Sequence, residues 1–458
     1  MKIIKNDHLH FFAIDLNKIK DKDIKNFKFF RDKDCFIFPI DKRNFCIKKF
    51  NWEIRNFFIN LKSIKDLTKK IDINVDSFLA LVDKSLYQSV INILLVNYEL
   101  LFNNKINYKS NKKIEIEANF IISKNLKNLV DFANNLVLAY KFAHSLQLLP
   151  NNQLNPDDFS NIVKKEFKQF QSLVEIRVLN KKELIAKKMN LILAVGQASD
   201  QKDEPKLLTI KFRNRKPKFT LIGKGITFDT GGICLKPSNY LKGMEWDMSG
   251  AAVAVGVMYA LCLNKQISDF GVVIPLAKND IGPNTTKTGD IIKSYDGASV
   301  EITNTDAEGR LILADAISYA IKDWKADTIS TIATLTGAII IAFDNVYSGY
   351  FTESKELNKK IKQASKISGE YIWGLPLNSI FDEKIHISSL ADLNNCLPGP
   401  NASSILGASF LKYFAKEKEF IHFDIAGTNE VKINSICSIV QPAMLSTLFY
   451  FVKDNYAK

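Results

Sequence analysis

The stretch Asn304-Thr305-Asp306-Ala307-Glu308-Gly309-Arg310 places two carboxylates two residues apart and follows them with an arginine. We place this stretch at a strand-to-helix turn. Alternate side chains of extended backbone share one face, so Asp306 and Glu308 are predicted to point the same way. Two such carboxylates can bind one cation or bridge two. An Asp-x-Glu pair is also common on solvated surfaces, so the pattern alone leaves an ordinary surface pair as the alternative.

Two segments upstream carry more polar residues of the same kind. They read Ile222-Gly223-Lys224-Gly225-Ile226-Thr227-Phe228-Asp229-Thr230-Gly231-Gly232-Ile233-Cys234-Leu235-Lys236-Pro237 and Met244-Glu245-Trp246-Asp247-Met248-Ser249-Gly250. The first is a strand-like run that enters a glycine turn, which is where α/β folds place ligand-binding groups. The carboxylates of Asp229 and Asp247 are hard oxygen donors suited to divalent cations.

Together these segments resemble the leucine aminopeptidase family, the cytosolic two-metal exopeptidases. The heptapeptide at 304–310 matches that family's signature, and the similarity runs from about Leu146 to the C-terminus. Seven positions have the spacing of the family's active site: Lys224, Asp229, Lys236, Asp247, Asp306, Glu308 and Arg310.

The resemblance implies two adjacent divalent ions, Mn²⁺ or Zn²⁺, in each subunit. The ligands that it implies are Lys224, Asp229, Asp247, Asp306 and Glu308. A lysine ligand must be neutral, so its pKa has to fall well below the ordinary value of about 10.4. Its nitrogen favours Zn²⁺, Mn²⁺ or Co²⁺ over Mg²⁺. The alternative for Lys224 is a solvated loop lysine.

The resemblance also implies roles for two cationic residues. Lys236 is expected to stabilise the tetrahedral oxyanion. Arg310 is expected to hold a bicarbonate ion that accepts the proton, because a planar guanidinium suits a carboxylate-like anion. The five histidines lie at positions 8, 10, 144, 386 and 422, outside these motifs, so the usual general base is missing. A surface lysine and a helix-start salt bridge are the alternatives for Lys236 and Arg310, and His422 is expected to pack on a strand.

A weaker resemblance concerns the substrate. The segment Ala333-Thr334-Leu335-Thr336-Gly337 is similar to the family loop that lines the cleft, and Met244 sits where the family lines the pocket for the first side chain. The expected substrate-binding residues are therefore Met244, Thr334, Leu335 and Gly337, each of which can equally be a core residue. The implied substrates are short peptides that lose N-terminal leucine or other apolar residues.

Periodicity predicts the fold class and the domains. A small N-terminal α/β domain is expected over 1–125, an interdomain helix over 126–150, and a larger catalytic domain over 151–458 with a mostly parallel sheet covered by helices. Apolar residues recur at helical spacing from Leu126 to Gln147. Strand-like runs are Leu191–Val195, Leu207–Phe212, Phe219–Ile222 and Val272–Leu276, and Ala251–Leu263 reads as a buried helix too short to span a bilayer.

Charge leaves a second function class open. Residues 1–220 carry 41 Lys and Arg against 24 Asp and Glu, and the remainder carries 22 against 25. Such a basic excess can engage DNA or RNA, although no basic run is interleaved with aromatic residues.

No secretion signal is expected and the six cysteines show no CxxC spacing, which favours the cytoplasm. We expect no membrane association, and the resemblance implies a homohexamer.

Overall fold

The computed structural model describes residues 8–15, 30–32, 35–63, 70–102, 106, 108, 110, 117–399, 401–432 and 438–457. The chain divides into two compact units. The N-terminal unit runs to Lys141 and includes Ala364–Glu370, and the main unit comprises Phe142–Gln363 and Tyr371–Lys458.

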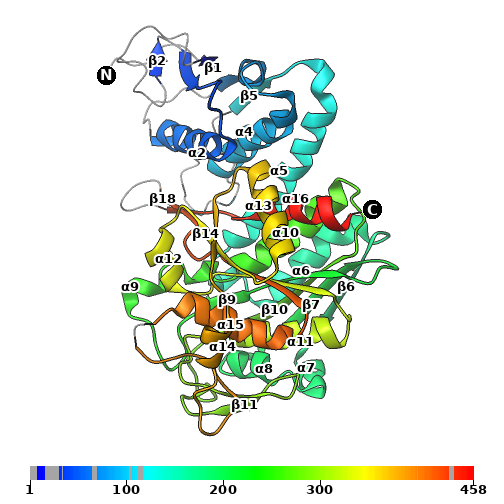
Figure 1. Ribbon diagram of the computed structural model, residues 1–458, viewed down its shortest axis with the longest axis vertical. Helices are drawn as coiled ribbons and strands as arrows, with labels where there is room; N and C mark the ends of the chain where they lie inside the picture. The colour runs from blue at the N-terminus through cyan, green and yellow to red at the C-terminus, as the bar shows by residue number, and fades with distance from the viewer. Residues whose placement is uncertain are drawn as a thin grey trace. The chain divides into compact units, whose positions relative to one another are not determined.

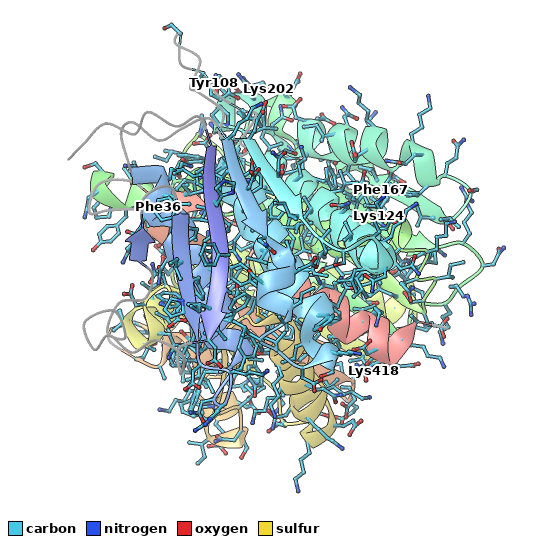
Figure 2. All side chains as sticks on the ribbon, turned by 90° about the horizontal axis from the view of Figure 1, so that it is seen from above. Phe36, Tyr108, Lys124, Phe167, Lys202 and Lys418 are labelled. Carbon is cyan, nitrogen blue, oxygen red and sulfur yellow. The ribbon has the colours of Figure 1, made fainter. Side chains whose placement is uncertain are left out.

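The N-terminal unit is a small α/β unit. Its elements are β1 His8–Asp15, β2 Phe30–Asp32, β3 Cys35–Ile40, α2 Ile47–Ser63, β4 Lys70–Asn74, α3 Val75–Leu79, α4 Tyr87–Phe102, β5 Glu117–Ile121 and the first part of α5 Lys127–Gln147. The strand order is β2-β3-β1-β4-β5, and only β2 pairs antiparallel among the described strands. Figure 2 shows these strands side by side. Aromatic rings fill the core, with Phe11 stacked on Phe57 at 3.9 Å between centroids.

The main unit alternates strands and helices. Its first half contains α6 Pro156–Phe167, β6 Val174–Leu179, α7 Lys181–Lys187, α8 Asn190–Gly196, β7 Lys206–Phe212, β8 Phe219–Gly223, β9 Gly225–Asp229, α9 Ser238–Leu241, α10 Ser249–Leu263, β10 Phe270–Asn279, β11 Ile291–Lys293 and β12 Ser299–Glu301. Its second half contains α11 Gly309–Lys322, β13 Thr328–Ala333, α12 Gly337–Phe343, β14 Ser348–Phe351, α13 Lys355–Ser368, β15 Ile372–Leu375, α14 Ser379–Glu383, β16 Leu393–Asn394, α15 Ser403–Ala415, β17 Glu419–Asp424, β18 Glu430–Lys432, β19 Ser438–Val440 and α16 Leu445–Tyr456.

One large sheet organises the main unit. Its described strands run in the order β15-β14-β17-β13-β8-β10-β7-β6, and β9 also pairs with β10. The central strands β17, β13, β8 and β10 are mutually parallel, whereas β14, β7 and β6 join antiparallel. Helix α10, backed by α16, covers one face, and α8, α11 and α15 pack together on the other (Figure 1). The predicted parallel-rich, helix-covered sheet is therefore confirmed.

The carboxyl ends of the parallel strands position the site. Strand β8 ends directly before Lys224, β9 ends at Asp229, and β13 ends directly before Thr334. Strands β8 and β13 are parallel neighbours, and β9 continues beyond β8 along β10. Their last residues therefore lie toward the carboxyl edge of the sheet, where α/β proteins bind ligands.

Two glycines let the start of α10 lie against this edge. A Cβ atom on Gly250 would lie 2.2 Å from the carbonyl oxygen of Ile332, and one on Gly223 would lie 2.5 Å from that of Gly250. The close approach allows the backbone amide of Ala251 to donate to the carbonyl of Lys224 at 2.9 Å. It thereby brings the loop after β8 beside the residues that precede α10.

One predicted strand is wrong. The run Leu191–Val195 lies in helix α8, whereas the other three strand-like runs lie in β7, β8 and β10 as predicted. The carboxylate of Asp315 on α11 accepts hydrogen bonds from the backbone amides of Leu191 at 2.9 Å and Ile192 at 3.1 Å. A distant carboxylate thus satisfies the free amides at the start of α8. A short apolar run by itself does not distinguish a buried strand from a buried helix.

The predicted helices over Leu126–Gln147 and Ala251–Leu263 correspond to α5 and α10. In the described residues, the stretch Ser238–Leu263 is long and apolar enough to cross a membrane, but 89% of its most apolar window is buried inside the protein. The core helix of a globular unit has the same properties, so the stretch is weak evidence for a membrane span.

Candidate metal centre and active site

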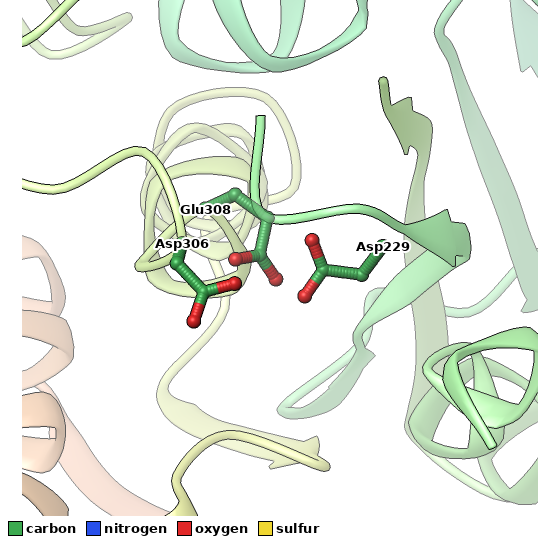
Figure 3. A group of neighbouring side chains, drawn as sticks. All are labelled: Asp229, Asp306 and Glu308. Carbon is green, nitrogen blue, oxygen red and sulfur yellow. The ribbon is translucent and has the colours of Figure 1, made fainter. Parts of the chain in front are cut away.

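Three carboxylates converge at the edge of the sheet. Asp229 ends β9, and Asp306 and Glu308 lie in the turn before α11. One oxygen of each lies within 4.8 Å of the others, and Figure 3 shows the three groups facing one another. Such a spacing allows the three carboxylates to share cations.

The segment that carries two of them is a turn between a strand and a helix, as predicted, but its backbone is not extended at Asp306 and Glu308. The amide of Ala307 donates to the carbonyl of Asn304 at 3.2 Å, and α11 begins at Gly309. Asp306 and Glu308 therefore converge because of the turn geometry, and alternation along a strand does not explain their common direction.

Lys224 connects a fourth carboxylate to this group. Its Nζ lies 2.9 Å from Oδ2 of Asp247 and 2.8 Å from Oε1 of Glu308, and it donates to the carbonyl of Thr334 at 3.0 Å. Burial disfavours the charged amine, but the attraction of Asp247 and Glu308 outweighs burial and raises the pKa of Lys224. The protein groups alone therefore keep Lys224 protonated.

Lys236 occupies the opposite side of the cluster. Its Nζ lies 2.8 Å from Oδ2 of Asp229 and also contacts Oδ1 of Asp306. Its backbone amide donates to the carbonyl of Thr230 at 2.9 Å, which fixes the glycine turn that carries it. Burial lowers the pKa of Lys236, but the nearby carboxylates raise it by more, so Lys236 is a cation at neutral pH.

Burial and neighbouring charges also shift the pKa values of the carboxylates. Burial, followed by repulsion from Glu308, raises the pKa of Asp229 to about 6, and burial also raises the pKa of Asp247 and Asp306. Burial acts in the same direction on Glu308, but the two lysines outweigh it and lower its pKa. Glu308 is thus the most firmly ionised member of the cluster.

A pocket of about 940 Å³ opens over these groups. All predicted site residues except Arg310 line it: Lys224, Asp229, Lys236, Met244, Asp247, Asp306, Glu308, Thr334, Leu335 and Gly337. Its apolar side also includes Trp246, Ile340, Ile341 and Ala426. One pocket therefore combines a carboxylate cluster with an apolar wall.

The loop after β13 joins the cluster to this wall. The Thr334 hydroxyl donates to Oδ1 of Asp247 at 2.6 Å. Asp424, at the end of β17, accepts from the Leu335 amide at 3.1 Å and the Thr336 hydroxyl at 2.7 Å. These bonds hold the backbone of the loop toward the pocket.

Arg310 lies behind the pocket wall. Its side chain is buried, with 6% of the residue exposed, and its Nη1 donates to the carbonyl of Asn395 at 2.7 Å. Its Nε has no hydrogen-bond partner among the described residues.

His422 packs on β17 as predicted, and its ring is stacked on Phe351. Burial, together with the charge of Arg310, lowers the pKa of His422 to about 3.

Sequence reasoning missed the residues that support the candidate ligands. Asn279 donates from Nδ2 to Oδ1 of Asp229 at 2.8 Å and to the carbonyl of Thr305 at 3.1 Å. It follows a shift in register between β10 and β9, which re-aims its side chain. Asn279 and Asp424 are polar residues at the ends of the buried strands β10 and β17. That position in the sequence could have indicated their place in the site.

Comparison with known proteins agrees with this geometry. Residues 141–444 match the model described as cytosol aminopeptidase family, catalytic domain. The chain belongs to this family. Members of the cytosol aminopeptidase family are metal-dependent peptidases, so the chain is a hydrolase that acts on peptide bonds.

Several relatives share much of the chain, each described as a probable cytosol aminopeptidase. The protein from Mycoplasma genitalium is 33% identical over 84% of this chain and 86% of its own length. The Legionella pneumophila (strain Corby) protein is 37% identical over 75% of this chain and 70% of its own length. The Wolbachia pipientis wMel protein is 42% identical, over 62% of this chain and 57% of its own length.

Gly309 provides a test of the Lys224 position. A Cβ atom there would lie 2.6 Å from Cε and 2.7 Å from Nζ of Lys224, so Gly309→Ala must displace the amine. We expect peptidase activity to fall about 10- to 100-fold, as misplaced catalytic groups do. The urea midpoint should fall as well, because the displaced ammonium no longer offsets the buried charges of Asp247 and Glu308. Full activity in this variant would show that the placement of Lys224 is unimportant.

Proposed function

We propose that the chain is a two-metal aminopeptidase that removes N-terminal residues, leucine and other apolar ones, from short peptides. The observation that carries the proposal is the convergence of four carboxylates and Lys224 at one end of an apolar pocket. A single tetrahedral ion takes four ligands, so five candidate donors favour two ions.

The donor set fits divalent ions. Asp247 Oδ2 and Glu308 Oε1 are buried and lack a conventional hydrogen bond among the described residues, although both lie beside the Lys224 amine. Carboxylate oxygens that face an ammonium group can face a divalent cation in its place, and one nitrogen donor suits Mn²⁺ or Zn²⁺. The positive charge of the ions would replace that of the ammonium group, which would allow Lys224 to lose its proton and ligate.

Bound ions would supply Lewis acidity and a water of lowered pKa for attack on the scissile carbonyl. The chain's own residues must do the rest. Lys236 is a cation at the mouth of the cluster, where it can stabilise negative charge on the carbonyl oxygen. Arg310 does not line the pocket, but its Nε has no hydrogen-bond partner among the described residues, and this free donor supports its assignment as the group that holds bicarbonate, the proposed proton acceptor.

The pocket also supports selection of the substrate. Met244, Leu335 and Ile340 can take an apolar first side chain, while Thr334 and Gly337 offer backbone groups to the peptide. The free α-amine of the substrate would be held at the carboxylate end. An internal peptide bond has no such amine, which explains removal of N-terminal residues.

A matched substrate pair tests this function. With Mn²⁺, the enzyme should hydrolyse leucine p-nitroanilide, and it should leave N-acetyl-leucine p-nitroanilide intact because that substrate lacks the amine. The aspartate analogue should react more slowly than the leucine substrate because it places a charge against the apolar wall. Equal hydrolysis of the free and acetylated substrates would refute the aminopeptidase assignment.

Replacement of Lys236 separates catalysis from metal binding. Lys236→Ala should lower kcat about 100-fold or more, the loss typical of a missing oxyanion donor, with the metal content unchanged. Lys216→Ala, which removes an exposed lysine that does not line the pocket, serves as the control. If Lys236→Ala loses its metal together with its activity, the residue is structural.

The assembly and location that we propose are a closed homohexamer in the cytoplasm. The names of the relatives support a cytosolic location, and closed symmetry is the usual arrangement of soluble oligomers. Light scattering should give about six times the chain mass of 51.9 kDa. A fully active monomer would exclude the hexamer.

Nucleic-acid binding by the basic N-terminal region remains the alternative function. It is supported by charge alone, whereas the peptidase proposal is supported by the converging donors and their pocket. Binding of duplex DNA that weakens steeply with salt, in a chain inactive toward the leucine substrate, would favour the alternative.

A further inference from the structure

Asn395 holds the turn that carries two of the proposed ligands. It is fully buried, directly follows β16, and does not line the pocket. Its Oδ1 accepts from the Thr303 amide at 2.8 Å, the Thr303 hydroxyl at 3.1 Å and the Asn304 amide at 3.3 Å. Its Nδ2 donates to the carbonyl oxygens of Asn304 at 2.6 Å and Ala307 at 3.4 Å.

The side-chain carboxamide of Asn395 continues the pairing of β12 with β16 beyond the last paired backbone groups. Strands β12 and β16 are parallel and pair Glu301 with Asn394, and the Asn395 amide donates to the Glu301 carbonyl at 3.0 Å. Beyond Glu301 the chain enters the turn, and the side chain of Asn395 takes over as donor and acceptor. A carboxamide offers both functions, as a peptide group does, whereas a carboxylate accepts only.

The backbone carbonyl of Asn395 binds α11, the helix that follows Asp306 and Glu308. The Asn395 carbonyl accepts from Nη1 of Arg310, the second residue of α11, at 2.7 Å. Asp306 and Glu308 therefore lie between two points that Asn395 fixes, the start of the turn and the helix that follows it.

We propose that Asn395 is a positioning residue of the metal centre, which acts by presetting the separation of Asp306 and Glu308. This inference rests on the proposed function. Outer partners that orient metal ligands typically contribute about 10- to 100-fold in metal affinity or activity. Asn395 does not line the pocket, so its loss should weaken metal binding and leave the ligands able to work once the ions are bound.

Two substitutions and a neighbouring control isolate this role. Asn395→Asp keeps the shape but removes both donors and turns a charge toward two carbonyl oxygens, and Asn395→Ala removes the whole clamp. Asn394→Ala is the matched control, because Asn394 is also buried but, among the described residues, its side chain donates only one long hydrogen bond, to Glu301 at 3.4 Å. Thr303→Val removes the hydroxyl from the turn side and leaves Asn395 in place.

The measurement is Mn²⁺ binding, followed by the electron paramagnetic resonance signal of free Mn²⁺ in the metal-stripped protein. Both Asn395 variants should bind Mn²⁺ about 10- to 100-fold more weakly, and Thr303→Val less severely. Asn394→Ala should bind like the wild type. At saturating Mn²⁺ the Asn395→Ala enzyme should regain kcat to within about threefold of the wild type, whereas Asp306→Ala should not.

The outcomes distinguish this inference from the proposed function. Wild-type affinity in both Asn395 variants overturns the positioning role. Weak binding in Asn394→Ala to the same degree also overturns it, because the effect would then be one of general packing. If the Asn395 variants do not fold, wild-type affinity in Thr303→Val overturns it. A wild-type protein that binds no Mn²⁺ refutes the proposed metal centre itself.

Discussion

Repulsion among four carboxylates, of which Asp229, Asp247 and Glu308 are buried and Asp306 is half-buried, is the constraint on which the site depends. Asp229, Asp247, Asp306 and Glu308 share one end of a pocket, and burial alone raises the free energy of every ionised member. Lys224 and Lys236 offset that cost from opposite sides. A protein keeps such a cluster when cations are to occupy it, because the same charges that repel one another bind divalent ions.

The fold supplies these charges from distant parts of the chain. Parallel strands end at one edge of the sheet, so residues that follow β8, β9 and β13 meet there. Glycines at positions 223 and 250 allow the backbone before α10 to approach the same edge. Asn279 and Asn395 donate and accept hydrogen bonds, and Asp424 accepts them, which fixes the segments that carry the proposed ligands. The geometry is therefore set by the sheet and refined by buried polar side chains.

The sequence predicted the residues of the site better than the reasons for their positions. Ten of the eleven residues expected from spacing and resemblance are among those that line the pocket, because the motifs that carry them are short and local, and their roles stay predictions. The common direction of Asp306 and Glu308 was attributed to an extended strand, but a turn produces it. The helix at Leu191–Val195 was missed since its start is satisfied by Asp315, far away in sequence. Asn395 gave no signal because a buried asparagine has no distinctive pattern.

The central claim is that this cluster binds two divalent ions between its carboxylates. Diffraction data collected at the manganese absorption edge from crystals soaked in Mn²⁺ test it most directly. We predict two anomalous peaks about 3.5–4 Å apart, the separation typical of two-metal hydrolases, within bonding distance of Asp229, Asp247, Asp306 and Glu308. A single peak, or peaks away from these carboxylates, would contradict the claim.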